Sequence, residues 1–141
     1  MNICERKIVA WSIEWEGSIQ LNSASRGKGG NYHIVPRVSI VNTSEELLET
    51  FREIVKVGYV NPIKYYFIWQ LHRQGDIREF LEEILPYLIT KKLRAEAVIA
   101  YCELRLSHSS LRHPYTEEEW ELTDLVCRLN KRGKEALVIA K

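Results

Sequence analysis

The sequence predicts an α+β domain in which helices cover one face of a four-stranded, curved antiparallel sheet. Three observations lead to this expectation. Two pairs of segments with alternating apolar and polar residues each surround a short turn, which is typical of β-hairpins. Each hairpin is followed by a segment with apolar residues at helical spacing. A helical segment opens the chain and two more close it, so we expect the order αββαββα with extra C-terminal helices.

The composition is that of one ordinary folded domain over residues 1–141. With 45% hydrophobic and 28% charged residues, the chain has enough apolar side chains to bury a core. No apolar run reaches the roughly 18–20 residues of a membrane-spanning helix, and nothing resembles a signal peptide. We therefore expect an intracellular location, cytoplasmic or organellar. The odd number and wide spacing of Cys4, Cys102 and Cys127 predict buried free thiols rather than disulfides.

The first predicted helix runs from about Glu5 to Glu16 and is apolar around most of its circumference, so it must pack on more than one side. Its last turn carries Glu14 and Glu16, where the helix dipole disfavours anions by roughly 0.3–1 kcal/mol each. Either a divalent cation compensates these carboxylates, or they are solvated at a frayed helix end. The large apolar members of the helix are Val9, Ala10, Trp11, Ile13 and Trp15.

A long hairpin follows, with strands over 18–25 and 32–41 joined by the glycine-rich segment 26–31. A helix is predicted from Ser44 to Lys56, because a capping signal precedes apolar residues at helical spacing. The residues of the hairpin that should face the core alternate along both strands: Ile19, Leu21, Ile34, Val38 and Ile40.

The second hairpin is predicted over 57–60 and 64–72, with its turn at Asn61-Pro62 and with Phe67, Trp69 and Leu71 facing the core. Asp76 should cap the next helix, which Pro86 ends.

A longer helix follows from about Leu88 to Leu106, with Leu93, Ala97 and Tyr101 on its apolar stripe. Thr116 should cap the last helix, which Gly133 stops.

Positive charge is concentrated in the two hairpins. Residues 17–42 and 54–75 together carry six positive charges and no acid, so the remainder of this chain of net charge +1 carries −5. A positive surface on an acidic body is typical of a phosphate-binding face. The alternative is that lysine and arginine merely protect the edges of strands.

Helices on one face of the sheet leave the other face free, and the polar side chains of that face can hydrogen-bond to DNA phosphates and base edges. A sheet face that is only solvated would have a similar composition. The candidate DNA-binding residues belong to this face and to the basic turns: Gln20, Asn22, Arg26, Lys28, His33, Arg37, Ser39, Lys64, Tyr66 and Gln70.

Two blocks of the sequence resemble the LAGLIDADG homing endonuclease family. Val9–Gly17 aligns without gaps with the nine-residue signature of the family, including its last acid and glycine. Phe80–Glu96 is very similar to the helix, proline-tyrosine-leucine and lysine segment of the family. The segments 42–44, 115–119 and 129–133 also look like family features, so the resemblance covers nearly the whole chain.

The resemblance implies an enzyme that hydrolyses both strands of a long DNA target with Mg²⁺. Glu16 would then be the metal-binding carboxylate, and the carbonyl of Gly17 would add a ligand. Asn42 would orient water near the scissile phosphate. Lys91 would stabilise charge or perturb the nucleophilic water, with Lys92 as the nearby alternative.

One signature per chain implies a homodimer and a nearly palindromic target. Trp11 and Trp15 stand where the family keeps small residues, so the two helices either cross through Ala10, Ser12 and Ile13 or pack in a different geometry. The residues that we expect in the dimer interface are Ala10, Trp11, Ile13 and Glu14.

Two alternatives use the same fold without DNA cleavage. One is a DNA-binding regulator or an RNA-splicing maturase that retains the sheet and has lost catalysis. The other is a structural relative that does not bind DNA.

Overall fold

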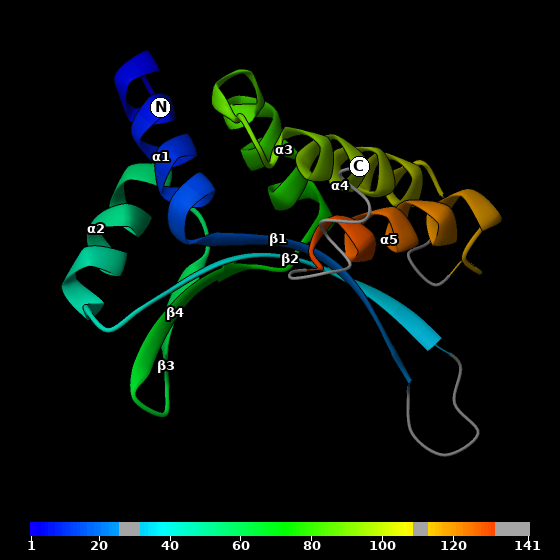
Figure 1. Ribbon diagram of the computed structural model, residues 1–141, viewed down its shortest axis with the longest axis horizontal. Helices are drawn as coiled ribbons and strands as arrows, with labels where there is room; N and C mark the ends of the chain where they lie inside the picture. Colours follow the sequence, from blue (N-terminus) through cyan, green and yellow to red (C-terminus); the bar gives the residue numbers. More distant parts are fainter. Residues whose placement is uncertain (26–31, 109–112, 132–141) are drawn as a thin grey trace.

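Every helix of the described residues lies on one side of a single curved sheet, and the other side of the sheet is open (Figure 1). The structure is a computed structural model that describes residues 1–25, 32–108 and 113–131. The strand order is β1-β2-β4-β3, and all neighbours are antiparallel. The predicted α+β fold is therefore confirmed. The elements are α1 (Ile3–Glu16), β1 (Gly17–Ser25), β2 (Tyr32–Asn42), α2 (Glu45–Val55), β3 (Tyr59–Ile63), β4 (Tyr66–Leu71), α3 (Gln74–Ile84), the 3₁₀ turn η1 (Leu85–Tyr87), α4 (Lys92–Ser107) and α5 (Glu117–Leu129).

Helix α1 begins earlier than the apolar pattern predicts, because Asn2 caps it. The Asn2 side chain accepts a hydrogen bond from the N–H of Glu5, and the Glu5 carboxylate accepts one from the N–H of Asn2. This reciprocal pair satisfies two backbone donors at the start of the helix. The helix ends at Glu16 and the chain passes directly into β1.

The turn of the second hairpin lies three residues later than predicted. Asn61 and Pro62 belong to β3, and the chain turns at Lys64 and Tyr65, where Lys64 has a φ of 47°. A proline is tolerated in β3 because this strand is at the edge of the sheet, where one side needs no backbone donor.

Two predictions about the C-terminal helices are wrong. Helix α3 begins at Gln74 rather than behind a cap at Asp76, which lies in its first turn. Helix α4 begins at Lys92, and Leu93 is exposed rather than part of the apolar stripe. The cap at Thr116 is confirmed, since its side chain accepts from the N–H of Glu119. No helix of the described part of the chain is long and apolar enough to cross a membrane.

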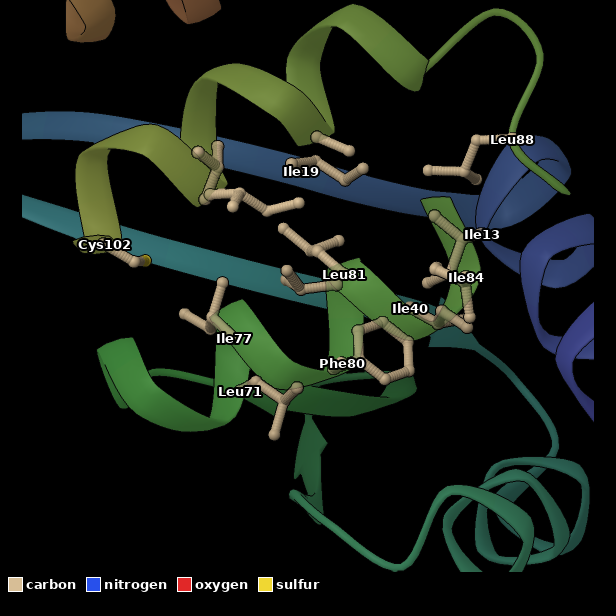
Figure 2. Packing of buried hydrophobic residues seen from close by; sticks show 14 of the residues in the cluster. Ile13, Ile19, Ile40, Leu71, Ile77, Phe80, Leu81, Ile84, Leu88 and Cys102 are labelled. Carbon is tan, nitrogen blue, oxygen red and sulfur yellow. The ribbon is translucent and has the colours of Figure 1, made fainter. Parts of the chain in front are cut away.

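The core lies between the sheet and helices α1, α3 and α4 (Figure 2). Trp69 is fully buried, packs edge-on against Phe51, and donates from its indole N–H to the carbonyl of Val57. Cys102 is buried as predicted, whereas Cys4 and Cys127 are exposed, so that prediction is wrong for two of the three thiols. The predicted core residues of the first hairpin are confirmed: Ile19, Leu21, Ile34, Val38 and Ile40.

Candidate functional site

The last turn of α1 places a carboxylate beside the end of β2. Glu16 Oε2 accepts a hydrogen bond from Asn42 Nδ2 at 3.1 Å. Asn42 Oδ1 in turn accepts from the backbone N–H of Ser44 at 2.8 Å, so the amide is held with its NH₂ group toward Glu16. Glu16 is exposed to solvent. Two of the residues predicted from the family resemblance therefore meet at one accessible point.

The ammonium group of Lys91 also binds the C-terminal end of α1. Lys91 Nζ donates to the carbonyls of Ile13 at 2.7 Å and of Gly17 at 2.6 Å. These carbonyls lie at the C-terminus of α1, where a cation is favoured by the helix dipole. Lys91 therefore has a structural role that the sequence did not indicate, and its positive charge lies beside the turn that carries Glu16.

Glu14 contacts the loop of its own chain before α4, and its predicted place in a dimer interface stays a prediction. Its Oε1 accepts from the N–H groups of Ile89 at 2.6 Å and Lys91 at 3.1 Å, and its Oε2 accepts from the Thr90 hydroxyl at 2.5 Å. Partial burial raises the pKa of Glu14, but these hydrogen bonds outweigh the burial and leave the pKa below its ordinary value of 4.5.

Glu14→Gln should therefore destabilise the fold in a pH-dependent way. Because the pKa is lower in the folded chain, the stabilisation is complete above pH 4.5 and is lost as the pH falls through the folded-state pKa. We expect a loss of about 1–2 kcal/mol at pH 7 from weaker hydrogen bonds, and a smaller loss at pH 3. Urea unfolding at both pH values measures this difference. Glu53→Gln, at an exposed site of α2, is the control, and an equal effect of Glu14→Gln at both pH values would contradict the assignment.

Gly17 permits the close approach between β1 and α1. A Cβ atom at this position would lie 2.8 Å from both Cα and the carbonyl oxygen of Ile13. Real side chains do not reach such distances, so a larger residue would displace the strand from the helix end. The glycine after Glu16 is therefore required by packing, independently of any role of its carbonyl.

The predicted polar residues of the sheet share its open face. Gln20 lies opposite Arg37, and its Oε1 accepts from Arg37 Nε at 3.2 Å, Arg37 Nη2 at 2.9 Å and Asn22 Nδ2 at 3.3 Å. Gln20 and Arg37 are half-buried and Asn22 is exposed, and the three side chains are pre-oriented by their own hydrogen bonds. The predicted residues placed on the open face by the register are Gln20, Asn22, His33, Arg37, Ser39, Tyr66 and Gln70.

The remaining predicted DNA contacts differ in their exposure. Ser39 is only 5% exposed between Ser18 and Gln70 of the neighbouring strands, so little of its surface is accessible in the free chain. Lys64 is exposed at the turn between β3 and β4. Arg26 and Lys28 lie outside the described residues.

The outer face of α1 carries two exposed indoles. Trp11 is 57% and Trp15 75% exposed, and their rings lie 6.2 Å apart. A hollow of about 570 Å³ lies between α1 and α2, and one of about 220 Å³ lies between α1 and the segment 87–90. Ala10 and Ile13 are fully buried in the core of the chain, so the prediction that they lie in a dimer interface is wrong.

The sequence patterns do not predict two features of the site. Arg94 and Lys131 line a polar hollow of about 440 Å³ together with Lys91 and Gln20. They come from elements far apart in the sequence, so local patterns carried no signal. The second feature is a group of apolar residues on the open sheet face near Asn42. The signal for it is the strict alternation of faces along β2 and β4, which predicts that face for the members of the group on these two strands.

The end of α1 carries oxygen atoms of the kind that bind divalent metal ions. The described residues contain no group of three or more His, Cys, Asp or Glu that could hold an ion. The oxygen donors at the end of α1 are the Glu16 carboxylate and the Gly17 carbonyl, which already accepts from Lys91. Such hard oxygen ligands suit Mg²⁺ or Ca²⁺.

Comparison with known proteins gives a structural match without a sequence match. No protein-family model and no curated protein matches the sequence. The homing endonuclease I-CvuI, in complex with a DNA target in the presence of Mg, matches with a TM-score of 0.78 and 20% identity over 94% of this chain and 88% of its own. The archaeal intron-encoded homing endonuclease I-Vdi141I, complexed with DNA, matches with a TM-score of 0.77 and 16% identity over 97% and 93%.

The LAGLIDADG meganuclease I-AabMI, bound to uncleaved DNA, matches with a TM-score of 0.71 and 15% identity over 99% of this chain and 48% of its own. The chain therefore has the LAGLIDADG homing endonuclease fold, as its resemblance to that family implied.

Proposed function

We propose that this chain is a site-specific DNA endonuclease that cleaves both strands of a long, nearly palindromic target as a metal-dependent homodimer. The observation that carries the proposal is the Glu16–Asn42 pair, an accessible carboxylate held in place at the edge of an open, hydrogen-bonding sheet face. The fold is that of structures described as DNA-bound homing endonucleases, which supports DNA as the substrate.

The open sheet face is the proposed DNA-binding surface. Its curvature suits a DNA groove (Figure 1), and the hairpin residues 17–42 and 54–75 carry positive charge without any acid. Arg37 and Gln20 lie side by side with fixed side chains, so they are pre-arranged to meet base edges. Arg94 and Lys131, at the polar hollow beside Gln20, are placed to neutralise phosphates.

Glu16 is the proposed ligand of the metal ion, with Mg²⁺ as the expected cofactor. When bound, such an ion activates water and stabilises the leaving oxygen of a phosphodiester. Asn42 holds the carboxylate and presents an amide where water near the scissile phosphate would lie. Lys91 fixes the end of α1 and contributes positive charge there. The Gly17 carbonyl has a second lone pair, so its role as a ligand stays a prediction.

A second copy of the chain is the proposed source of the further oxygen ligands that the metal ion needs. Two related copies supply two Glu16 carboxylates and two cleavage positions, one for each strand. The exposed face of α1, with Trp11 and Trp15, is the surface that we assign to this contact.

The alternative of a binder without catalysis is favoured by one observation. The Lys91 ammonium is held by two backbone carbonyls, which accounts for a lysine at this position without any role in cleavage. A DNA-binding regulator or a splicing maturase with this fold would keep the same contact.

A cleavage assay separates these functions. We expect the chain to cut specific members of a randomised library of long duplexes with Mg²⁺, and not with EDTA. Sequencing of both the bound and the cut fractions gives the two readouts from one library. A regulator enriches sequences without cutting them, and a chain that enriches no duplex in low salt contradicts DNA binding altogether.

A further inference from the structure

Next to Asn42, the open sheet face carries a group of apolar side chains, with the polar residues Ser39 and Asn61 as its neighbours. Val41, Ile63 and Tyr66 are 40%, 42% and 47% exposed around Ile68, which is 7% exposed. Val41 pairs with Ile68 and Ile63 pairs with Tyr66, so these side chains form one continuous group across β2, β4 and β3. We refer to these four residues as the apolar group.

The apolar group and the polar row lie at different positions along the strands of the same open face. Val41 immediately precedes Asn42, which holds Glu16. The polar row with Gln20 and Arg37 lies along β1 and β2 in the direction of the pair Ser25–Tyr32. That pair is eight residues from Gly17, a distance of roughly 26 Å at about 3.3 Å per residue. On a duplex that follows the face, the apolar group meets base pairs near the cut and the polar row meets outer ones.

Exposed aliphatic side chains on a sheet, here Val41 on the inner strand β2 and Ile63 on the edge strand β3, need an explanation, because such surfaces pair with other chains and aggregate. Their surroundings identify DNA as the partner. The exposed Lys64 lies in the turn beside Ile63, and the whole stretch 54–75 lacks acidic residues. The group is also continuous with the hydrogen-bonding row of the proposed DNA surface. In the major groove, the apolar atom that distinguishes bases is the 5-methyl carbon of thymine.

We propose that the apolar group recognises thymine methyl groups, so that each half of the target contains A·T pairs at the positions nearest the cut. This inference rests on the proposed function, because it needs the open face to bind duplex DNA. It adds a chemical rule for the inner part of the target, where these residues offer few hydrogen bonds, whereas Arg37 and Gln20 read outer positions by hydrogen bonding.

Replacement of thymine by deoxyuridine tests the inference with the unmodified chain, since uracil lacks only the methyl group. Duplexes are first enriched from a randomised library by binding in EDTA, and inner and outer thymines are then replaced separately. We expect inner thymines to be enriched, and each inner replacement to weaken binding about three- to fourfold, as expected for one buried methyl group. Fluorescence anisotropy titrations give the dissociation constants.

Substitutions assign the effect to the apolar group. Val41→Thr and Ile63→Thr keep the β-branched shape that strands favour. The first replaces a methyl group by a hydroxyl, and the second replaces an ethyl group by a hydroxyl. We expect these variants to bind thymine and uracil duplexes equally at inner positions. Leu106→Thr is the matched control, because Leu106 is 40% exposed on α4, away from the open face. It should keep the discrimination of the unmodified chain.

The outcomes distinguish this inference from the proposed nuclease function. If the chain enriches targets with inner thymines but cuts none, the methyl rule holds and the nuclease proposal fails. If it cuts a target in which inner uracil binds as well as thymine, the methyl rule alone is overturned. If Leu106→Thr loses the discrimination as Val41→Thr does, the apolar group is not its source.

Discussion

Glu16→Gln should abolish cleavage of both DNA strands and leave target binding within about twofold. Glutamine has the same shape and can still accept the hydrogen bond from Asn42, but it lacks the charge that attracts a divalent ion. Loss of a group that stabilises charge in a transition state lowers rates by about 10²–10³-fold, and we expect at least this loss. Single-turnover cleavage with Mg²⁺ measures the rate, and anisotropy titration in EDTA measures binding.

The control for this substitution is Glu53→Gln, which removes one exposed carboxylate from α2, away from the site. It should cleave at the rate of the unmodified chain. If Glu16→Gln also cleaves at that rate, the metal-binding assignment is wrong. If Glu16→Gln loses binding as well as cleavage, the carboxylate has a structural role and the rate cannot be interpreted.

The strand pattern could be predicted because burial alternates along it. Ile19, Leu21 and Trp69 lie on the core face as the period of two requires, and the polar residues fall on the other face. The pattern misplaces the turn of the second hairpin, because the pair Asn61-Pro62 is typical of turns but belongs to β3 in the structure. The sheet tolerates Pro62 only because β3 is an edge strand. Strand order is a property of the whole sheet, so local sequence does not contain it.

The buried face of α4 is predicted less well than the strands, for a different reason. Arg105 is 1% exposed and forms an ion pair at 3.1 Å with the buried Glu119 of α5, while Leu93 points to solvent. Hydrophobic periodicity alone predicts the reverse, with Leu93 buried and Arg105 exposed to solvent. A charge is buried only when a partner meets it, and here the partner comes from another helix 14 residues away, so periodicity within α4 could not reveal it.

The candidate site was predictable through the family resemblance but not through its contacts. Glu16 and Asn42 were identified separately, and the structure joins them. The sequence did not show that Lys91 binds the carbonyl of Gly17, 74 residues away, or that Glu14 binds the same loop. Contacts of this range depend on how α1 packs against α3 and η1, so the roles could be predicted while the geometry could not.

The exposed face of α1 has the shape expected of a self-complementary contact. Trp15 projects from the helix with 75% of its surface exposed. Beside it lies the hollow of about 570 Å³ between α1 and α2, lined by apolar residues such as Leu47 and Phe51. In a two-fold arrangement, the indole of each copy can enter the hollow of the other. Such packing keeps the backbones of the two helices apart, which accommodates tryptophan where small residues are usual.

Trp15→Lys should therefore convert the proposed dimer to a monomer and stop the proposed double-strand cleavage. A buried interfacial tryptophan contributes at least about 2 kcal/mol, and both copies lose one, so we expect the dimer dissociation constant to rise by roughly 10³-fold. Sedimentation velocity over a concentration series without DNA measures it. Because Trp15 is exposed in the single chain, the melting temperature of the monomer should be unchanged. Leu106→Lys places the same charge at an exposed leucine of α4 and should dimerise normally. A Trp15→Lys chain that still dimerises normally would move the contact away from α1.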